Sequence, residues 1–359
     1  MNEDTSEQRY IYVPLSGNEA KTRIETMLEE AGVFAITNYE MAPGNSLYAV
    51  DDYLNRYAAG EPNVRALFDR NLFDPVLRAA GGEELRDNPI ERLAMALMAF
   101  TGAARVDIEP SLALYEVAAK QGHAFAMEEL ESFRRAEALE PIAFQHLAFG
   151  DAPQIPRWVL QQSPAGHKDE LPAGAFDRGL REWKRHRLAL TKVALLARDQ
   201  TGFDGMMELF RWSEEDAYFD GVAITLASTL LSPRSTGGVL SQFRSPHPER
   251  RVQGVENAAW DLTYVTEFTK RAEEDDALWV FCTADKRLAE LTRAWLGMDG
   301  GLDDLLRRYW DSKDASRLVA EYNRAWERKR RPAVAADAGE RVRELEDMQE
   351  RLLTALEIR

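Results

Sequence analysis

Hydrophobic and polar positions alternate differently in successive parts of the chain, and the first part reads as mixed α/β. The pattern predicts a strand in RYIYV (residues 9–13), a helix over residues 18–30 and a second apolar run at residues 33–36. A further apolar strand, VRALFD, ends on Asp69. Residues 88–136 then have a mostly helical pattern.

The middle of the chain gives weaker signals. Five prolines between Pro141 and Pro172 predict an irregular connection, because proline interrupts regular structure. Two helical patterns follow over residues 176–198 and 203–231, and residues 235–248 have the glycine, serine and proline content of a loop.

The clearest periodic pattern lies between residues 255 and 268, where apolar side chains recur every three or four positions and predict an amphipathic helix. The continuous apolar run ALWVFC, residues 277–282, comes directly after it and is typical of a parallel strand buried on both faces. The tail from Gly301 is predicted to be helical. Its apolar stripe could pack on the body or pair with a second chain: Val342, Leu345, Leu352 and Leu356.

Composition indicates an ordinary globular protein, with 45% hydrophobic and 30% charged residues over 359 positions. That length favours more than one structural unit. The single cysteine, Cys282, excludes an internal disulfide and suits a reducing compartment. We find no segment that resembles a signal peptide and no apolar run long enough to cross a membrane. We therefore expect a soluble, cytoplasmic protein that does not bind membranes.

A net charge of −16 argues against a protein that coats nucleic acid, since phosphate binding requires cations. A local basic groove is still compatible with this charge. Three basic segments could supply one, at residues 181–187, 244–251 and 324–331, although each also reads as a solvated helix face or loop.

Carboxylates follow both apolar strands. Asp69 ends the first and Asp285 follows the second, and in open parallel sheets ligands bind beyond the carboxyl ends of strands. Asp261 interrupts the apolar face of its helix, and Glu116 lies in an otherwise apolar helix. Four acids brought together repel one another unless a cation lies among them, and Mg²⁺ or Mn²⁺ suits an oxygen-rich site. Such a site activates water for phosphodiester cleavage.

These acids and their neighbours resemble the motifs of PIN-like domain nucleases. The family pattern has D-x-N after an apolar strand, a helical Glu, an N-A-x-x-D helix and a T-x-D after the next strand. The matching residues, in chain order, are Asp69, Asn71, Glu116, Asn257, Asp261, Thr283 and Asp285. The match covers about a third of the chain. Glu109 is an alternative to Glu116, although it precedes Pro110 and could only cap the helix.

The resemblance implies an α/β fold with a central parallel sheet and a discontinuous PIN-like core. The implied organisation is an αβ extension at 1–59, the core at 60–122 and 254–300, a helical insertion at 123–253 and a helical region at 301–359. It also implies a Mg²⁺- or Mn²⁺-dependent endoribonuclease of toxin or antiviral defence type. A regulatory partner or second copy would bind through the insertion or the C-terminal helix.

The resemblance also implies roles for the matching residues. Asp69 and Asp285 would coordinate the metal, and Glu116 and Asp261 would complete the site or position the attacking water. The supporting residues would orient the turns around these acids, Asn71 beside Asp69 and Thr283 through a bond to a neighbouring carboxylate or backbone group.

Two other functions compete with this one. Haloacid dehalogenase-like phosphatases also have an acid after a strand, but Asn71 stands where that family needs a second Asp as acid and base. A catalytically inactive helical interaction protein is the non-enzymatic alternative. The sequence has no zinc-ligand spacing, P-loop, dinucleotide-binding motif or serine-hydrolase elbow.

Overall fold

The computed structural model divides into two compact units. Unit 1 comprises residues 1–176 and 275–284, and unit 2 comprises residues 177–274 and 285–359. Within them the structure describes residues 17–31, 34–37, 46–86, 88–162, 174–176, 179–235, 237–274, 277–329 and 338–358. The strand predicted at residues 9–13 lies outside these ranges.

Unit 1 combines a small sheet with a helical cover. Its strands are β1 (Phe34–Thr37), β2 (Val64–Phe68), β3 (Asp107–Ile108) and β4 (Leu278–Thr283). Its helices are α1 (Asn18–Ala31), α2 (Val50–Ala58), α3 (Arg70–Ala80), α4 (Pro89–Ala104), α5 (Ser111–Gln121), α6 (His123–Glu137), α7 (Pro141–Phe149) and α8 (Arg157–Gln162).

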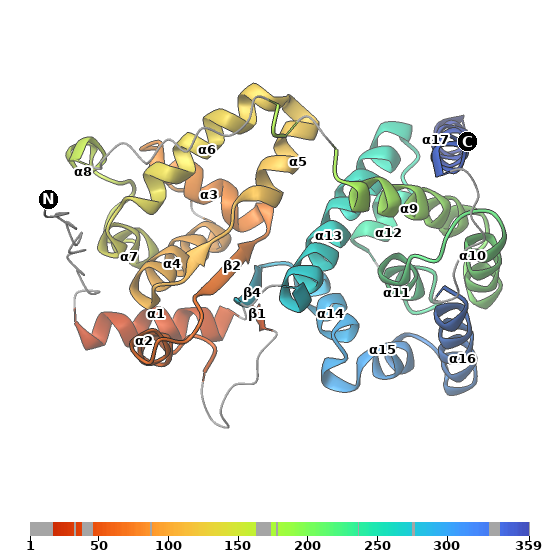
Figure 1. Ribbon diagram of the computed structural model, residues 1–359, viewed down its shortest axis with the longest axis horizontal. Coiled ribbons are helices and arrows are strands. Elements are labelled where there is room, and N and C mark those ends of the chain that lie inside the picture. Colours follow the sequence, from red (N-terminus) through yellow and green to blue (C-terminus); the bar gives the residue numbers. More distant parts are fainter. Residues whose placement is uncertain are drawn as a thin grey trace, which may run out of the picture. The chain divides into compact units, whose positions relative to one another are not determined.

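The sheet has the strand order β1-β4-β2-β3. Strands β4, β2 and β3 run parallel, which confirms the predicted parallel sheet, whereas β1 pairs with β4 in the antiparallel direction and makes the sheet mixed. Figure 1 shows β4 next to β1 and β2 although it follows them by about 200 residues. The α/β class therefore holds only for a small sheet in a mostly helical protein.

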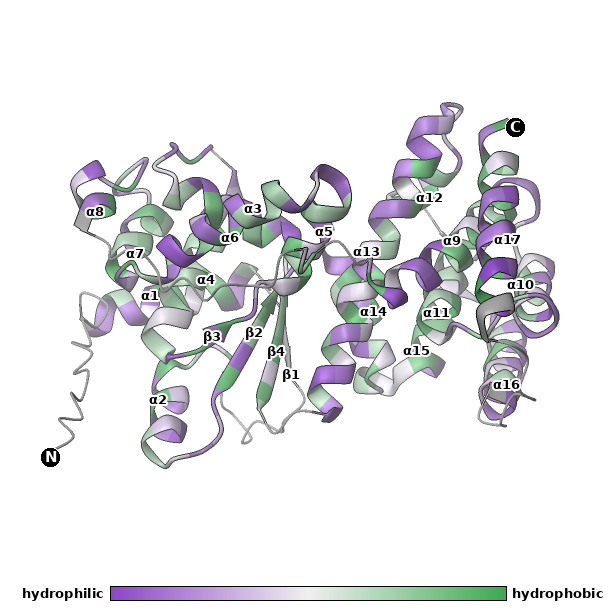
Figure 2. Ribbon diagram, turned by 45° about the horizontal axis from the view of Figure 1, so that its top comes forward, coloured by the Kyte–Doolittle hydropathy of each residue, from purple (hydrophilic) through white to green (hydrophobic). Residues whose placement is uncertain are grey.

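Both faces of the two central strands are buried. Ala66 and Phe68 of β2 pair with Val280 and Cys282 of β4, and these four residues face the same helical core. On the opposite face Leu67, Trp279 and Phe281 are also buried. Figure 2 shows β2 and β4 side by side with hydrophobic residues in each. This double burial explains why each strand is a continuous apolar run rather than an alternating one.

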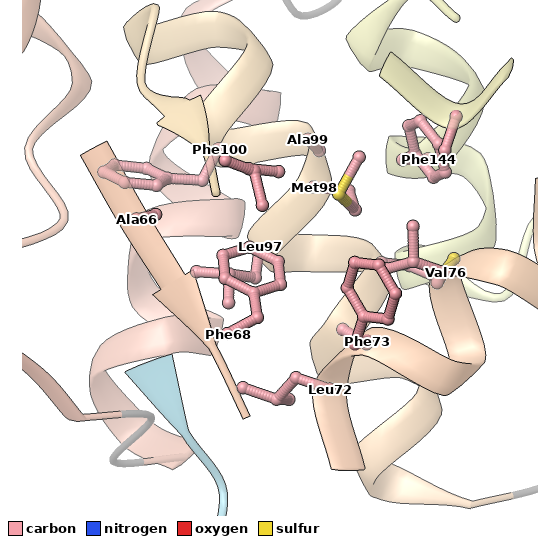
Figure 3. Close-up of a cluster of buried hydrophobic side chains, with 14 of the residues drawn as sticks. Ala66, Phe68, Leu72, Phe73, Val76, Leu97, Met98, Ala99, Phe100 and Phe144 are labelled. Carbon is pink, nitrogen blue, oxygen red and sulfur yellow. The ribbon is translucent and has the colours of Figure 1, made fainter. Parts of the chain in front are cut away.

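The core of unit 1 lies between β2 and helices α3, α4 and α7. Figure 3 shows Phe68 of β2 near Leu97 of α4, with Phe73 and Val76 of α3 close to Phe144 of α7. All five side chains are almost fully buried. Removing a large side chain from such a core costs about 2–5 kcal/mol.

The proline-rich segment is more ordered than its composition predicted. Pro141 is the first residue of α7 and Pro156 comes directly before α8, so the prediction of an irregular connection over residues 141–172 is wrong for residues 141–149 and 157–162. The physical reason is that proline at the start of a helix loses no hydrogen bond. The predicted loop at 235–248 likewise contains a short helix, α12 (Val239–Phe243).

The described residues of unit 2 form helices joined by turns and loops, without a strand. Its α-helices, besides α12, are α9 (Arg181–Asp199), α10 (Phe203–Glu215), α11 (Gly221–Leu230), α13 (Pro248–Glu274), α14 (Lys286–Trp295), α15 (Gly301–Tyr309), α16 (Ser312–Lys329) and α17 (Ala338–Ile358). A 3₁₀ turn, η1 (Met298–Gly300), precedes α15. The predicted amphipathic helix is confirmed as part of α13, which packs on α9, α12 and α17.

A buried polar group links three helices of unit 2. His186 of α9 lies with its Nδ1 2.7 Å from Oδ2 of Asp220 and its Nε2 2.9 Å from Oγ1 of Thr266 in α13. Asp220 also accepts a hydrogen bond from the Ala223 N–H at the start of α11. Burial alone would raise the pKa of Asp220, but His186 and this N–H together lower it.

The predicted domain boundaries and the compact units divide the chain differently. Helices α6, α7 and α8 lie in the predicted insertion, yet they belong to unit 1, where α6 packs on α3 and α5. Helix α13 lies in the predicted core, yet it belongs to unit 2, where it packs on α9. Within the residues that the structure describes, no helix is both long and apolar enough to span a membrane.

The C-terminal helix docks on unit 2 through a buried arginine. Helix α17 packs on α9 and α13, and Leu356 is fully buried. Arg251 of α13 is 2% exposed and donates to the carbonyl oxygen of Leu356 at 2.6 and 2.8 Å, and to that of Ser245 at 2.9 Å. A cation at the carboxyl end of a helix also stabilises the helix dipole. The structure thus packs α17 on the body of its own chain, with Leu356 of the predicted stripe buried and Val342 54% exposed.

Replacing Arg251 with Ala should therefore loosen α17. The change leaves buried carbonyl oxygens without a donor, and each such loss costs about 1–3 kcal/mol. We expect a lower midpoint in chemical denaturation and faster amide hydrogen exchange within residues 338–358. The exposed neighbour Arg250 provides the matched control, and Arg250→Ala should leave both measurements unchanged. Equal effects of the two substitutions would contradict this role of Arg251.

Candidate active site

Asp69 is a buried carboxylate at the carboxyl end of β2. It is 3% exposed and forms the N-cap of α3, where its Oδ1 accepts a hydrogen bond from the Leu72 N–H at 3.0 Å. Its other carboxylate oxygen accepts a hydrogen bond from the hydroxyl of Thr283, the last residue of β4. The Asp69 N–H in turn donates to the Cys282 carbonyl at 3.0 Å. The start of α3 and the end of β4 therefore hold this one carboxylate.

Cys282 lies beside this carboxylate and is chemically quiet. Its side chain is buried on β4, and burial together with the nearby charge of Asp69 raises the pKa of the thiol. A protonated, buried thiol is a poor nucleophile and a poor metal ligand. The side-chain atoms near the end of β4 that could bind a metal are therefore oxygen atoms and not the thiol.

Glu116 lies in α5 and is 6% exposed. Its Oε1 accepts a hydrogen bond from Lys120 Nζ one turn later at 2.7 Å. The alternative acid, Glu109, accepts from the Ser111 N–H at 3.0 Å and so caps the start of α5. This contact matches the capping role that the sequence allowed for Glu109. Glu116 is thus the buried acid of the two.

The sequence pattern did not predict a cluster of charged side chains that lies near Glu116. Arg70 of α3 binds Glu129 of α6 through two hydrogen bonds of 2.6 Å, and it also donates to the Ala113 carbonyl in α5 at 3.2 Å. Arg70 Nε lies 2.5 Å from Asp74, whose side chain is 48% exposed. Partial burial, with the charges of Glu129 and Glu116, raises the pKa of Asp74. Only the position of Arg70 directly after Asp69 could have drawn attention to it.

In unit 2, Asp261 and Asp285 line the same cavity, which has a volume of about 100 Å³. Asp261 is half-buried on α13. Asp285 is exposed and is the N-cap of α14, where its Oδ1 accepts hydrogen bonds from the N–H groups of Arg287 and Leu288 at 2.8 and 3.1 Å. Asp261 interrupts the apolar face of α13 because that part of the helix forms a wall of this cavity.

The two supporting amides lie on exposed surfaces. Asn71 is in the first turn of α3, and Asn257 accepts a hydrogen bond from Gln253 at 2.8 Å along α13. Thr283 is the supporting residue that contacts a predicted acid, as described above. The capping of α3 comes from Asp69 itself.

The four predicted acids divide between the units, with Asp69 and Glu116 in unit 1 and Asp261 and Asp285 in unit 2. In the parts of the chain that the structure describes, no three or more His, Cys, Asp or Glu side chains form a group that could hold a metal ion. The sequence matches no family model, no curated protein and no solved structure. The function must therefore be argued from the residues themselves.

The hydrogen bond from Thr283 to Asp69 should be strong because its acceptor is a buried carboxylate. Thr283→Val preserves the shape and removes the donor, and we expect it to lower the free energy of unfolding by about 1.5–3 kcal/mol. Thr283→Ser keeps the hydroxyl and should lose less. Thr292→Val is the control, since the hydroxyl of that buried threonine donates to the carbonyl of Leu288 within a helix. Urea denaturation would contradict the prediction if all three variants lost equal stability.

The burial of Cys282 predicts that its thiol will not react in the folded protein. Because the raised pKa keeps the thiol protonated, a maleimide or disulfide reagent at pH 8 should label the native chain at least ~100 times more slowly than the urea-unfolded chain. Labelling is measured by mass spectrometry. The unfolded protein is the control, and rapid labelling of the native chain would show that the β4 core opens.

Proposed function

We propose that this protein is a metal-dependent nuclease that hydrolyses phosphodiester bonds, with RNA as its substrate. The observation that carries the proposal is the buried carboxylate of Asp69 at the carboxyl end of β2, held by Thr283 from the end of β4. Two parallel strands that end together in this way form the edge where ligands bind in open α/β sheets. The motifs that resemble the PIN-like family include both residues.

The donor chemistry of the four acids suits a hard divalent cation. Asp69, Glu116, Asp261 and Asp285 offer carboxylate oxygens, and the one cysteine is buried with a raised thiol pKa. When bound, Mg²⁺ or Mn²⁺ would lower the pKa of a water molecule and balance the charge that develops on phosphate. The described residues contain no ready group of three metal ligands. A measurement of Mn²⁺ binding therefore tests the proposed metal site independently of cleavage.

Hydrogen bonds from neighbouring groups would hold two of these acids, Asp69 and Asp285, in fixed conformations. Thr283 and the Leu72 N–H fix the rotamer of Asp69, so its carboxylate loses little freedom when it acts. The N–H groups of Arg287 and Leu288 do the same for Asp285.

The biological setting belongs to the same proposal. A toxin or antiviral defence endoribonuclease acting in the cytoplasm fits the resemblance. A single buried cysteine is compatible with that reducing compartment. These assignments rest on the family resemblance and on the residues that carry it.

A second candidate, a helical interaction protein without catalysis, is favoured by one specific observation. Asp69 and Asp285 each cap the helix that follows, and Asp is a preferred residue at this position for structural reasons alone. A structural role could therefore account for both acids. Replacing them with Asn separates the two interpretations, because Asn keeps the cap and removes the negative charge.

Purified protein should cleave labelled single-stranded RNA in Mn²⁺ and lose this activity in EDTA. Asp69→Asn and Asp285→Asn should each lower the rate by at least the roughly 10- to 100-fold seen even for groups behind metal ligands. Both should fold normally because the caps remain. Asp303→Asn, which alters an exposed acid paired with Arg307, is the control and should retain full activity. Cleavage that survives both site substitutions would remove the assignment.

Calorimetric titration with Mn²⁺ gives a readout independent of turnover. The unsubstituted protein should bind the ion, and Asp69→Asn should weaken binding more than Asp303→Asn does. A protein that neither binds Mn²⁺ nor cleaves RNA or single-stranded DNA would be the interaction protein instead.

A further inference from the structure

A hydroxyl, an imidazole and a carboxylate are joined by hydrogen bonds in unit 2, and the proposed nuclease does not use them. They belong to Thr266 of α13, His186 of α9 and Asp220, the N-cap of α11. Nε2 of His186 lies 2.9 Å from Oγ1 of Thr266, and its Nδ1 lies 2.7 Å from Oδ2 of Asp220. His186 is 34 positions from Asp220 and 80 from Thr266, so no local pattern predicted this Thr266–His186–Asp220 group.

The carboxylate of Asp220 orients the imidazole. Asp220 is 4% exposed, and its Oδ1 accepts a hydrogen bond from the Ala223 N–H at 3.1 Å. Burial raises the pKa of this carboxyl, but His186, the Ala223 N–H and the charge of Arg185 together lower it. A charged carboxylate only accepts hydrogen bonds, so it holds the proton of the neutral imidazole on Nδ1. Nε2 is then an acceptor that faces the hydroxyl of Thr266.

The hydroxyl of Thr266 has a different partner from those of its neighbours in α13. Thr263 and Thr269 donate to carbonyl oxygens of the preceding turn at 2.7 and 2.8 Å, which is a common bond for a threonine within a helix. Thr266 is hydrogen-bonded to His186 instead. It is half-buried, whereas His186 and Asp220 are almost fully buried. Thr266 is therefore the member of the group that a small substrate can reach.

We propose that this group hydrolyses esters of small carboxylic acids, with Thr266 as the nucleophile and His186 as its general base. A hydroxyl becomes an effective nucleophile when a base within hydrogen-bond reach takes its proton, and the base acts best when a third group orients it. The two measured contacts have this order and these distances. The activity needs no metal ion, and its residues lie in unit 2, whereas Asp69 and Glu116 lie in unit 1.

The reaction proceeds in two steps that consume one water molecule. In the first, the Thr266 oxygen bonds to the carbonyl carbon of the ester while its proton moves to Nε2 of His186. The bond to the leaving oxygen then breaks, and the alcohol leaves with the proton from Nε2. In the second, water attacks the acyl-threonine and gives a proton to Nε2, which returns it to the Thr266 oxygen as the carboxylic acid departs. Asp220 stays charged and stabilises the protonated imidazole.

The test follows hydrolysis of p-nitrophenyl acetate by the full chain in EDTA, and mass spectrometry of peptides locates any acetyl group on Thr266. The variants are His186→Gln, which removes the base, Thr266→Ala, which removes the nucleophile, and Thr266→Ser, which keeps a hydroxyl. Thr269→Ala is the matched control, because it removes the hydroxyl of the next threonine of α13, whose partner is a backbone carbonyl. Urea denaturation checks that each variant is folded.

We expect the unsubstituted protein and Thr269→Ala to release p-nitrophenol at equal rates. His186→Gln should be at least ~100 times slower, since a general base contributes about 10²–10⁴-fold to the rate. Thr266→Ala should be as slow, and Thr266→Ser should keep most of the rate and carry the acetyl group on the new hydroxyl. If Thr266→Ala does not fold, the other two variants still decide the result.

Two results would overturn the proposal. One is a protein whose Thr266 carries no acetyl group during hydrolysis, and the other is a folded His186→Gln variant that is as fast as the unsubstituted protein. The group would then serve only to link α9, α11 and α13. The nuclease is tested separately, because ester hydrolysis is measured in EDTA and RNA cleavage in Mn²⁺. Either activity can be lost while the other remains.

Discussion

Burial of the Asp69 carboxylate is the constraint on which unit 1 depends. A buried charge is tolerated only when its hydrogen bonds are made, and here the donors come from α3 and from the end of β4. The Thr283 hydroxyl reaches Asp69 only in the observed register, in which Phe68 faces Cys282. A shift by one residue would turn Thr283 to the other face of the sheet and leave the carboxylate without this donor. The hydrogen bond from Thr283 to the Asp69 carboxylate therefore requires the observed register of β2 and β4, and it also stabilises that register.

The same constraint bears on why these positions carry acids. Helix capping alone would accept Ser, Thr or Asn in place of Asp69 and Asp285, and a neutral cap would avoid the cost of burying an anion. At the exposed Asp285 the cost is small, but at Asp69 it is not. Capping explains the geometry of both residues better than it explains the negative charge at Asp69. The proposed cation-binding role would supply the missing reason, which is why the buried acid carries more weight in the proposal than the exposed one.

Local patterns predicted those features that depend on neighbouring residues. The apolar runs of β2 and β4 and the periodic face of α13 follow directly from the residues that each element buries, and these predictions were correct. Helices α7 and α8 were missed because proline was taken as a breaker where it begins a helix. The two residues of β3 are too few to form a pattern. The Arg70 to Glu129 pair joins residues 59 positions apart, and the cavity in unit 2 arises where several helices meet, so neither leaves a local signal.

The large negative charge determines how this protein could recognise an anion. A net charge of −16 repels nucleic acid at long range, but at 0.1 M salt that field is screened beyond about 10 Å. Binding of an anion would therefore depend on a positive charge at contact distance rather than on the overall charge of the protein. In the proposed function, a divalent cation held by the acids would supply that charge next to the phosphate.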